Sequence, residues 1–413
     1  MKIKLLALFV LFNVAFTAFS KNPKFKTGYW YASLILSESD HLPVMIEFQK
    51  EKKSTRLSII NGSERILLDD LEFQGDSIFI EFPAFDSEIR AKVHSKSHIS
   101  GNWYNHAKKG NYYIPFWTKY KYADKYPVHT PSIDVTGKWE VTFDYDDNPY
   151  KSIGIFESNI QNGCVVKELT NRVTGTFLTE TGDYRFLEGA TIKDSLYLST
   201  FDGSHAFLFK AQFRKDTLWG EFLSGNHYRS NWFALRNETF EIGHPDSLTT
   251  YSNASEINFS LPDLTGETYN FPKDADKNKV TLIQIMGTWC PNCLDESMYL
   301  KTLQNTHGDK LQIIAVTFET QKELTDKIKK VDTYRTNLEL PYKFLIGGNA
   351  CKSCATDLFP SLSKIISFPT LIFIDKQGEI RKVHTGFNGP GTGKYYDQFV
   401  SSTNSFVQQL INE

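Results

Sequence analysis

Two pairs of cysteines share a spacing that supports thiol chemistry. The segment "MGTWCPNCLDE" contains Cys290 and Cys293, and "NACKSCATD" contains Cys351 and Cys354. Two cysteines separated by two residues can form a redox-active disulfide, a structural bridge, or half of a zinc site with four thiolate ligands. The choice depends on the elements that position each pair and on the compartment in which the protein works.

The first pair lies where an apolar run ends and a helix is expected to begin. The run "KVTLIQIMG" at 279–287 is typical of a buried strand. Cys290 would then lie at the amino terminus of the helix, where unpaired N–H groups and the positive dipole end favour a thiolate over a thiol. We therefore predict that Cys290 is the nucleophile and that Cys293, one turn further along, resolves the mixed disulfide. Pro291 suits the first helical turn because its missing N–H is not needed there.

Further apolar runs indicate the sheet that carries this pair. The segments "LQIIAVTFE" at 311–319, "YKFLIGG" at 342–348 and "PTLIFID" at 369–375 read as strands, and helical segments fall between them. Strands that alternate with helices predict a mixed or parallel α/β sheet with both faces covered. We assign this α/β domain to residues 257–413 and a polar linker to residues 241–256.

Three motifs in the α/β domain resemble the TlpA-like branch of the thioredoxin superfamily. They are "FSLPDLTGE" at 259–267, "TLIQIMGTWCPNC", and "SFPTLIFIDKQGEIRKVHTGFNGPGTG" at 367–393. The resemblance implies a thioredoxin-like fold and thiol-disulfide exchange outside the cytoplasm. It also implies that Trp289 flanks the nucleophile, that Pro369 is a cis-proline facing the cysteine pair, and that Phe368 offers backbone hydrogen bonds to a bound partner chain.

The sequence departs from this family at the residue that often supplies a buried carboxylate. That strand position is Gln284 here, so no carboxylate is expected from it, and Asp295 and Glu296 are the nearest acids in sequence. Glu296 is a candidate for proton transfer, and the alternative is an ordinary acid of the first helical turn that complements the dipole. His384 is likewise a candidate for proton transfer, with an ordinary structural role as the alternative. Gly386 is expected to permit a close approach of another chain segment.

The second cysteine pair also precedes an expected helix. Residues 294–350 separate the two pairs, far more than the about 15 to 20 residues of familiar zinc arrangements, so we expect no metal and no cofactor. Cys351 and Cys354 are expected to form an auxiliary disulfide, either structural or in exchange with the active pair. A thiol peroxidase is disfavoured, because Thr288 lies one residue away from the position that the peroxidase motif requires and its proline is absent.

The start of the chain predicts export. "MKIK" is followed by the apolar stretch "LLALFVLFNVAFTAF" and by small residues near Ser20, which together indicate a signal peptide at residues 1–20. An uncleaved membrane anchor is the alternative. We expect a chain secreted across the inner membrane into the periplasm, with no stable membrane span after cleavage. Disulfides persist in that compartment.

Residues 21–240 have a different pattern from the α/β domain. Polar and apolar residues alternate in short runs separated by "NG", "GD" and "DG" pairs, which is typical of antiparallel strands joined by tight turns. "TGYWYASL" at 27–34 recurs as "TGKWEVTF" at 136–143. We predict two tandem antiparallel β modules, β module 1 at 21–133 and β module 2 at 134–240, each a lipocalin-like barrel or a meander.

Composition excludes several classes of partner. The 413 residues carry a net charge of −2, and the lysine-containing aromatic segment at 112–126 is too local for a nucleic-acid footprint, so no nucleic acid is expected. Cys164 has no nearby partner and is interpreted as a buried, inert thiol.

The cysteine pair, the family resemblance and the signal peptide together predict that this multidomain chain is an exported disulfide reductase. It would act on protein disulfides, and an upstream membrane or periplasmic electron donor would reduce it again. The alternative is a partner-binding protein in which the β modules carry the function and the thioredoxin-like domain is auxiliary. The presence of both Cys290 and Cys293, together with Pro369, favours the enzyme.

Overall fold

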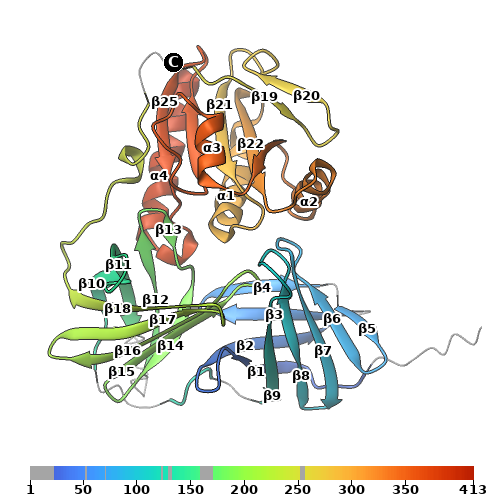
Figure 1. Ribbon diagram of the computed structural model, residues 1–413, viewed down its shortest axis with the longest axis vertical. Helices are drawn as coiled ribbons and strands as arrows, with labels where there is room; N and C mark the ends of the chain where they lie inside the picture. The colour runs from blue at the N-terminus through green and yellow to red at the C-terminus, as the bar shows by residue number, and fades with distance from the viewer. Residues whose placement is uncertain are drawn as a thin grey trace, which may run out of the picture.

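A computed structural model describes most of the chain. The described residues are 23–51, 54–69, 71–121, 124–128, 133–158, 171–251 and 256–413. The predicted signal peptide and Cys164 lie outside these described residues. Figure 1 shows two β layers side by side, with an α/β domain placed above both of them.

Among the described residues, nine antiparallel strands form the first sheet in the order β4-β3-β2-β1-β9-β8-β7-β6-β5. Alternating burial along β6 and β7 places one face of this sheet on an apolar core and the other in solvent, as the alternating sequence predicts. The strands are β1 Gly28–Ile35, β2 His41–Lys50, β3 Thr55–Asn61, β4 Glu64–Leu68, β5 Leu71–Gln74, β6 Ser77–Glu81, β7 Ser87–Ser95, β8 His98–Asn105 and β9 Tyr113–Tyr120.

The second sheet follows the same order but closes on itself. Its described strands run β11-β10-β18-β17-β16-β15-β14-β12, and β11 also pairs with β12, so these eight strands form a closed barrel. The short strand β13 pairs with β12 alone and projects from the barrel as a hairpin. The strands are β10 Gly137–Phe143, β11 Tyr150–Ser158, β12 Arg172–Thr179, β13 Gly182–Asp183, β14 Leu187–Ile192, β15 Ser195–Phe201, β16 Ala206–Arg214, β17 Thr217–Ser224 and β18 Tyr228–Arg236.

A buried tryptophan in the first strand of each sheet marks the repeat. Trp30 and Trp139 are both inaccessible to solvent. Each indole Nε1–H donates to the carbonyl oxygen four residues earlier, of Lys26 at 3.1 Å and of Val135 at 2.9 Å. The fold class is confirmed here, because both sheets are antiparallel β modules. In the first, β1 also pairs with β9 and no pairing joins β4 to β5 among the described residues, whereas the second is a closed barrel.

The α/β domain is built on a mixed sheet of order β23-β22-β21-β24-β25. Strands β21, β22 and β23 are parallel, β24 runs against them, and β25 is antiparallel to β24. Every residue of β21 is buried, as expected for a central strand covered on both faces. The strands are β19 Phe259–Pro262, β20 Thr268–Phe271, β21 Val280–Met286, β22 Leu311–Glu319, β23 Lys343–Asn349, β24 Thr370–Ile374 and β25 Ile380–Thr385, and the helices are α1 Pro291–His307, α2 Leu324–Asn337, α3 Lys352–Leu358 and α4 Lys394–Asn412. Short 3-10 turns occur at η1 Pro245–Ser247, η2 Gly308–Lys310 and η3 Pro390–Thr392.

The described part of the segment predicted as a linker packs on β25. The Asp246 carboxylate contacts His384 Nδ1 at 2.6 Å, and the hydroxyl oxygens of Thr249 and Thr385 lie 2.8 Å apart. The segment is therefore held against the α/β domain over η1 and the residues that follow it. None of the helices in the described ranges combines the length and the apolar character needed to cross a membrane.

Candidate active site

Cys290 lies at the junction between β21 and α1, as the sequence predicts. Its sulfur is the N-cap of the helix: Sγ accepts the backbone N–H of Cys293 at 3.3 Å. The thiol of Cys290 also donates to the carbonyl oxygen of Phe368 at 3.4 Å. The Phe368–Pro369 peptide bond is cis, as the family resemblance implies. The structure thus brings the predicted nucleophile, its partner cysteine and the cis-proline loop together.

Trp289 is fixed beside this loop. Its indole Nε1–H donates to the carbonyl oxygen of Phe318 at 2.8 Å, and its ring meets Phe368 edge-on with centroids 5.6 Å apart. The indole crosses so close to Gly287 that a Cβ there would lie 2.3 Å from Nε1. A glycine at this position therefore allows the tryptophan to flank the nucleophile.

Cys293 and Glu296 lie in the interior beneath Cys290, both without solvent exposure. Burial, together with the hydrogen bond and charge of Cys290, raises the pKa of the Cys293 thiol well above its usual value. Burial also raises the pKa of Glu296 to about 8, although a hydrogen bond from Gln284 opposes this shift. Gln284 Nε2 donates to Glu296 Oε2 at 2.9 Å and to the Cys293 carbonyl oxygen at 3.4 Å.

This geometry corrects one of the alternatives for Glu296. An ordinary acid of the first turn would face solvent and the exposed helix N–H groups. Glu296 instead points into the interior toward Gln284, and its Oε1 atom has no hydrogen-bond partner. As expected, the strand supplies no carboxyl group at Gln284, and the buried carboxyl group beside the pair comes from the helix instead.

Glu319 connects the two cysteine-bearing loops. Its carboxylate accepts the N–H of Thr288 at 3.0 Å and the hydroxyl of Thr288 at 2.6 Å, and its carbonyl oxygen accepts the N–H of Ala350 at 2.9 Å. The hydroxyl of Thr288 is thus directed at Glu319, and a peroxide-binding role gains no support from its position. The loop after β21 and the loop after β23 are held at the same edge of the sheet, on either side of β22.

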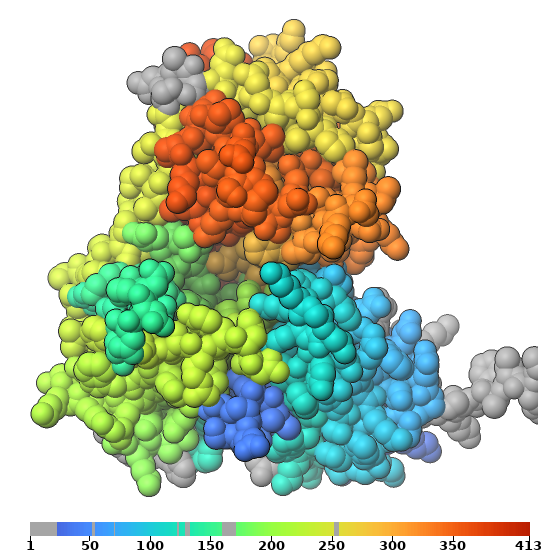
Figure 2. Space-filling model, viewed as in Figure 1, coloured from blue at the N-terminus to red at the C-terminus, as the bar shows by residue number. Residues whose placement is uncertain are grey.

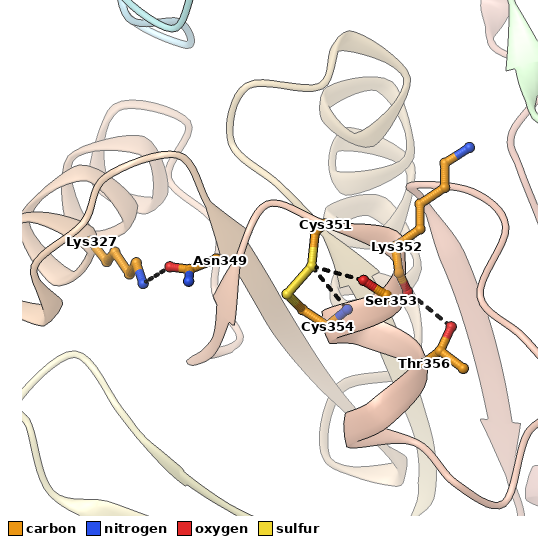
Figure 3. The surroundings of a disulfide bond; sticks show 7 residues. All are labelled: Lys327, Asn349, Cys351, Lys352, Ser353, Cys354 and Thr356. Atoms are coloured by element: carbon orange, nitrogen blue, oxygen red, sulfur yellow. Dashed lines mark hydrogen bonds between the residues drawn. A yellow bond between two sulfur atoms is a disulfide. The ribbon is translucent and has the colours of Figure 1, made fainter.

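Cys351 and Cys354 form a disulfide at the start of α3 (Figure 3). Their Cα atoms lie 5.2 Å apart, and the Cys351 sulfur accepts the N–H of Cys354 at 2.9 Å. The two loops leave strands β21 and β23, which are two strand spacings, about 10 Å, apart. Direct exchange requires Cα atoms within about 7 Å, so this arrangement favours a structural disulfide.

We expect the Cys351–Cys354 disulfide to persist when the active pair is reduced. Trypsin cleaves at Lys352, so mass spectrometry of the non-reduced protein should show peptide 344–352 linked to peptide 353–364. Replacing both cysteines by serine should lower the free energy of unfolding by about 2 kcal/mol and leave the turnover of small disulfides unchanged. Two free thiols in these peptides, or a loss of turnover in the double variant, would contradict a structural role.

The structure does not support the predicted role of His384 but does show the predicted close approach at Gly386. His384 is buried on β25, and burial lowers its pKa even though Asp246 opposes this effect. Its imidazole contacts Asp246 and Phe399, so the structure does not bring it to the cysteine pair. Gly386 has a φ of 79°, and a Cβ there would lie 2.9 Å from the carbonyl carbon of Thr181, so the predicted close approach is present. The approaching segment belongs to the barrel.

The barrel brings to this site residues that the sequence does not indicate. Arg185 Nη1 donates to the carbonyl oxygen of Pro291, between the two active-site cysteines, at 3.2 Å and to Asp295 Oδ2 at 2.5 Å. The carbonyl oxygen of Asp183 accepts Asn292 Nδ2 at 3.4 Å. The only signal in the sequence was the "GD" pair, which predicts a turn but not its docking surface.

Within the described ranges, no cluster of three or more His, Cys, Asp or Glu side chains could hold a metal ion.

Known proteins resemble the α/β part of the chain. The sequence profile of the Redoxin family matches residues 252–398. The thioredoxin-like protein YneN of Bacillus subtilis is 31% identical over 129 residues, which cover 31% of this chain and 68% of that protein. The thiol-disulfide oxidoreductase ResA of Halalkalibacterium halodurans is 29% identical over 163 residues, which cover 39% of this chain and 78% of that protein.

Among solved structures, StoA from Bacillus subtilis aligns with a TM-score of 0.26 and 20% identity, over 36% of this chain and 98% of that one. The Redoxin match does not extend over the two β modules. Its residues include both active-site cysteines and the cis-proline. Through this C-terminal domain the chain belongs to the thioredoxin-like thiol-disulfide oxidoreductases of the TlpA-like branch.

Proposed function

We propose that the protein is an exported disulfide reductase in which Cys290 and Cys293 carry the reaction. One observation supports this most strongly: a sulfur at a helix N-cap lies against a cis-proline loop, above a second, fully buried sulfur and a buried carboxyl group. The first sulfur is placed for attack, and the second is protected until the first has reacted. Proteins with disulfides that are exposed outside the cytoplasm are the proposed substrates.

The reaction begins when the Cys290 thiolate attacks one sulfur of the substrate disulfide. A Cys290–substrate disulfide forms, the substrate S–S bond breaks, and the departing sulfur takes a proton from solvent. The N–H of Cys293, 3.3 Å from Cys290 Sγ, stabilises negative charge on the attacking sulfur. The backbone of Phe368 would align the partner chain beside the cis-proline, as in the family that the sequence resembles.

Cys293 completes the exchange. Its thiol must lose a proton before it can attack, and its raised pKa keeps it protonated until a base is available. Glu296, with a pKa of about 8, is matched to accept that proton near neutral pH. The Cys293 thiolate then attacks Cys290 Sγ, the Cys290–Cys293 disulfide forms, and the second substrate thiol leaves. Two electrons pass from the protein to the substrate, and an upstream dithiol donor in the membrane or periplasm restores them.

The reduction potential tests the proposed direction. Redox titration of the purified protein against glutathione buffers, followed by Trp289 fluorescence, should place the pair nearer to about −270 mV than to about −120 mV. A value close to about −120 mV would indicate an oxidase of protein thiols instead. Failure to form a Cys290–Cys293 disulfide at any potential would contradict thiol-disulfide exchange at this site.

A further inference from the structure

β module 2 covers part of the face on which the nucleophile lies. Figure 1 shows β13 rising from the barrel toward the α/β domain, near the lower end of α4. In Figure 2 the yellow-to-red α/β domain rests on both the green second module and the blue-to-cyan first module. Cys290 is only 8% exposed in the assembled chain, and Phe368 only 9%. Access to the sulfur is therefore decided partly by residues outside the thioredoxin-like domain.

The hairpin at residues 179–185 bonds to the backbone and side chains that flank Cys290. Ser367 Oγ, just before the cis-proline loop, donates to the carbonyl oxygen of Thr181 at 2.8 Å. The carboxylate of Asp183 accepts the N–H of Gly389 at 2.6 Å. With the bonds to Pro291 and Asn292 described above, the hairpin reaches both the Cys-x-x-Cys turn and the proline loop.

Glycines make this docking close. A Cβ at Gly182, where φ is 144°, would lie 2.0 Å from Asn292 Nδ2. A Cβ at Gly391 would lie 2.8 Å from the carbonyl carbon of Arg185. Together with Gly386, these positions show that the two surfaces fit without room for side chains at their points of contact.

A buried arginine fixes the hairpin. The guanidinium of Arg185 contacts carboxylates from all three parts of the chain: Glu64 at 2.7 Å from β module 1, Asp202 at 3.4 Å from the barrel, and Asp295 at 2.5 Å from α1. Moving the hairpin away would break the ion pairs to Glu64 and Asp295 together. The hairpin is therefore a permanent part of the site rather than a lid that opens in each turnover.

A second loop of the barrel contacts the opposite end of the motif. Ser204 Oγ donates to the carbonyl oxygen of Trp289 at 3.4 Å. β module 1 holds this loop in turn, because Asn105 Nδ2 donates to the Ser204 carbonyl oxygen at 3.0 Å and Ser87 Oγ donates to that of Gly203 at 2.5 Å. The barrel thus contacts the active-site turn on both sides of Cys290.

We infer that the hairpin at residues 179–185 is a fixed wall of the active site that selects disulfides by their steric surroundings. Given the proposed function, on which this inference rests, a sulfur atom can approach Cys290 only if little bulk surrounds the disulfide. Low-molecular-weight disulfides and disulfides in flexible, extended peptide segments share this property. A disulfide that lies flush with the surface of a folded protein would collide with the hairpin before its sulfur reached Cys290.

The test compares three disulfides with the full-length protein: hydroxyethyl disulfide, a flexible peptide with one disulfide, and folded insulin. We expect kcat/KM for insulin to be about 100-fold below that for the better of the other two. The ratio of kcat/KM for hydroxyethyl disulfide to kcat/KM for the flexible peptide shows which of the two kinds of disulfide the site prefers. Equal kcat/KM values for insulin and the flexible peptide would overturn the inference that the hairpin selects disulfides by their steric surroundings. Failure to reduce any of the three would instead contradict the proposed function.

Two variants address the wall directly. Arg185→Ala and Gly182→Ala should each raise the ratio of insulin to hydroxyethyl disulfide turnover by about 10-fold, because they loosen the hairpin by different means. Arg214→Ala removes an arginine from the same module, and Gly75→Ala introduces strain at a positive φ with no atom within 4 Å. Neither control should change the ratio. An unchanged ratio in a folded Gly182→Ala variant, judged by circular dichroism, would also overturn the inference.

Discussion

Replacing Cys293 by serine is expected to turn the protein from a catalyst into a trap. Cys290 can still attack a substrate disulfide, but no second thiol is present to release the partner, so a mixed disulfide accumulates. Replacing Cys290 by serine should instead remove disulfide reduction altogether, a loss of several orders of magnitude in kcat/KM. Non-reducing electrophoresis after mixing with a disulfide substrate separates these outcomes, because only the Cys293→Ser variant yields a band shifted by the mass of the partner.

The double variant Cys351→Ser, Cys354→Ser is the control, because it removes cysteines from the same domain and leaves Cys290 and Cys293 in place. It should show no trapped complex and normal turnover. Alkylation at low pH should label Cys290 before Cys293, because Cys293 is fully buried and its pKa is raised. Preferential labelling of Cys293 would reverse the two roles.

Glu296→Gln should stabilise the protein and slow its second chemical step. The folded state raises the pKa of Glu296 from 4.5 to about 8, so the folded protein binds one proton more than the unfolded chain between these values. The stabilising contribution of the neutral carboxyl group is complete below about pH 4.5 and is lost as the pH rises through about 8. Glutamine stays neutral, so the variant should gain on the order of 4 kcal/mol over the wild type near pH 9 but little near pH 4.

Urea denaturation of the reduced proteins at several pH values measures this difference. Asp295, whose pKa burial raises to about 7, contributes a similar trend in both proteins and cancels in the comparison. Glu267→Gln, at an exposed position of the same domain, should leave the curve unchanged. In stopped-flow experiments, the rate of mixed-disulfide resolution should lose its inflection near pH 8 in Glu296→Gln. A retained inflection would exclude Glu296 as the proton acceptor.

The α/β domain could be predicted in some detail, because its information is local. The run before Cys290 is apolar at nearly every position, and such a run before a Cys-x-x-Cys pair indicates a central strand followed by a helix. The position of Glu296 was also within reach. It lies three residues after Cys293, so both side chains share one face of α1, and a buried cysteine implies a buried carboxyl group beside it.

The β modules were predictable only in part. Repeated tryptophans and alternating residues identify two copies of one antiparallel unit. The second copy closes into a barrel because β11 pairs with β12, and no local sequence pattern indicates this pairing. The wall depends on contacts between residues more than 100 positions apart, such as Arg185 with Pro291. Neither Thr181 nor Asp183 differs in type from an ordinary turn residue, so the sequence contains no local signal for this docking.

The triple pairing of Arg185 has a consequence for how the molecule unfolds. Three hydrophobic clusters correspond largely to the three parts of the chain, although the cluster of β module 1 also includes Phe201, Ala206, Leu208 and Leu223 of the barrel. Parts with their own cores can melt in separate steps. Glu64, Asp202 and Asp295 come from all three parts and converge on one buried guanidinium. Unfolding of one part would break the ion pairs that it shares with the others, so it would weaken its neighbours. We therefore expect the three parts to melt in a single calorimetric transition.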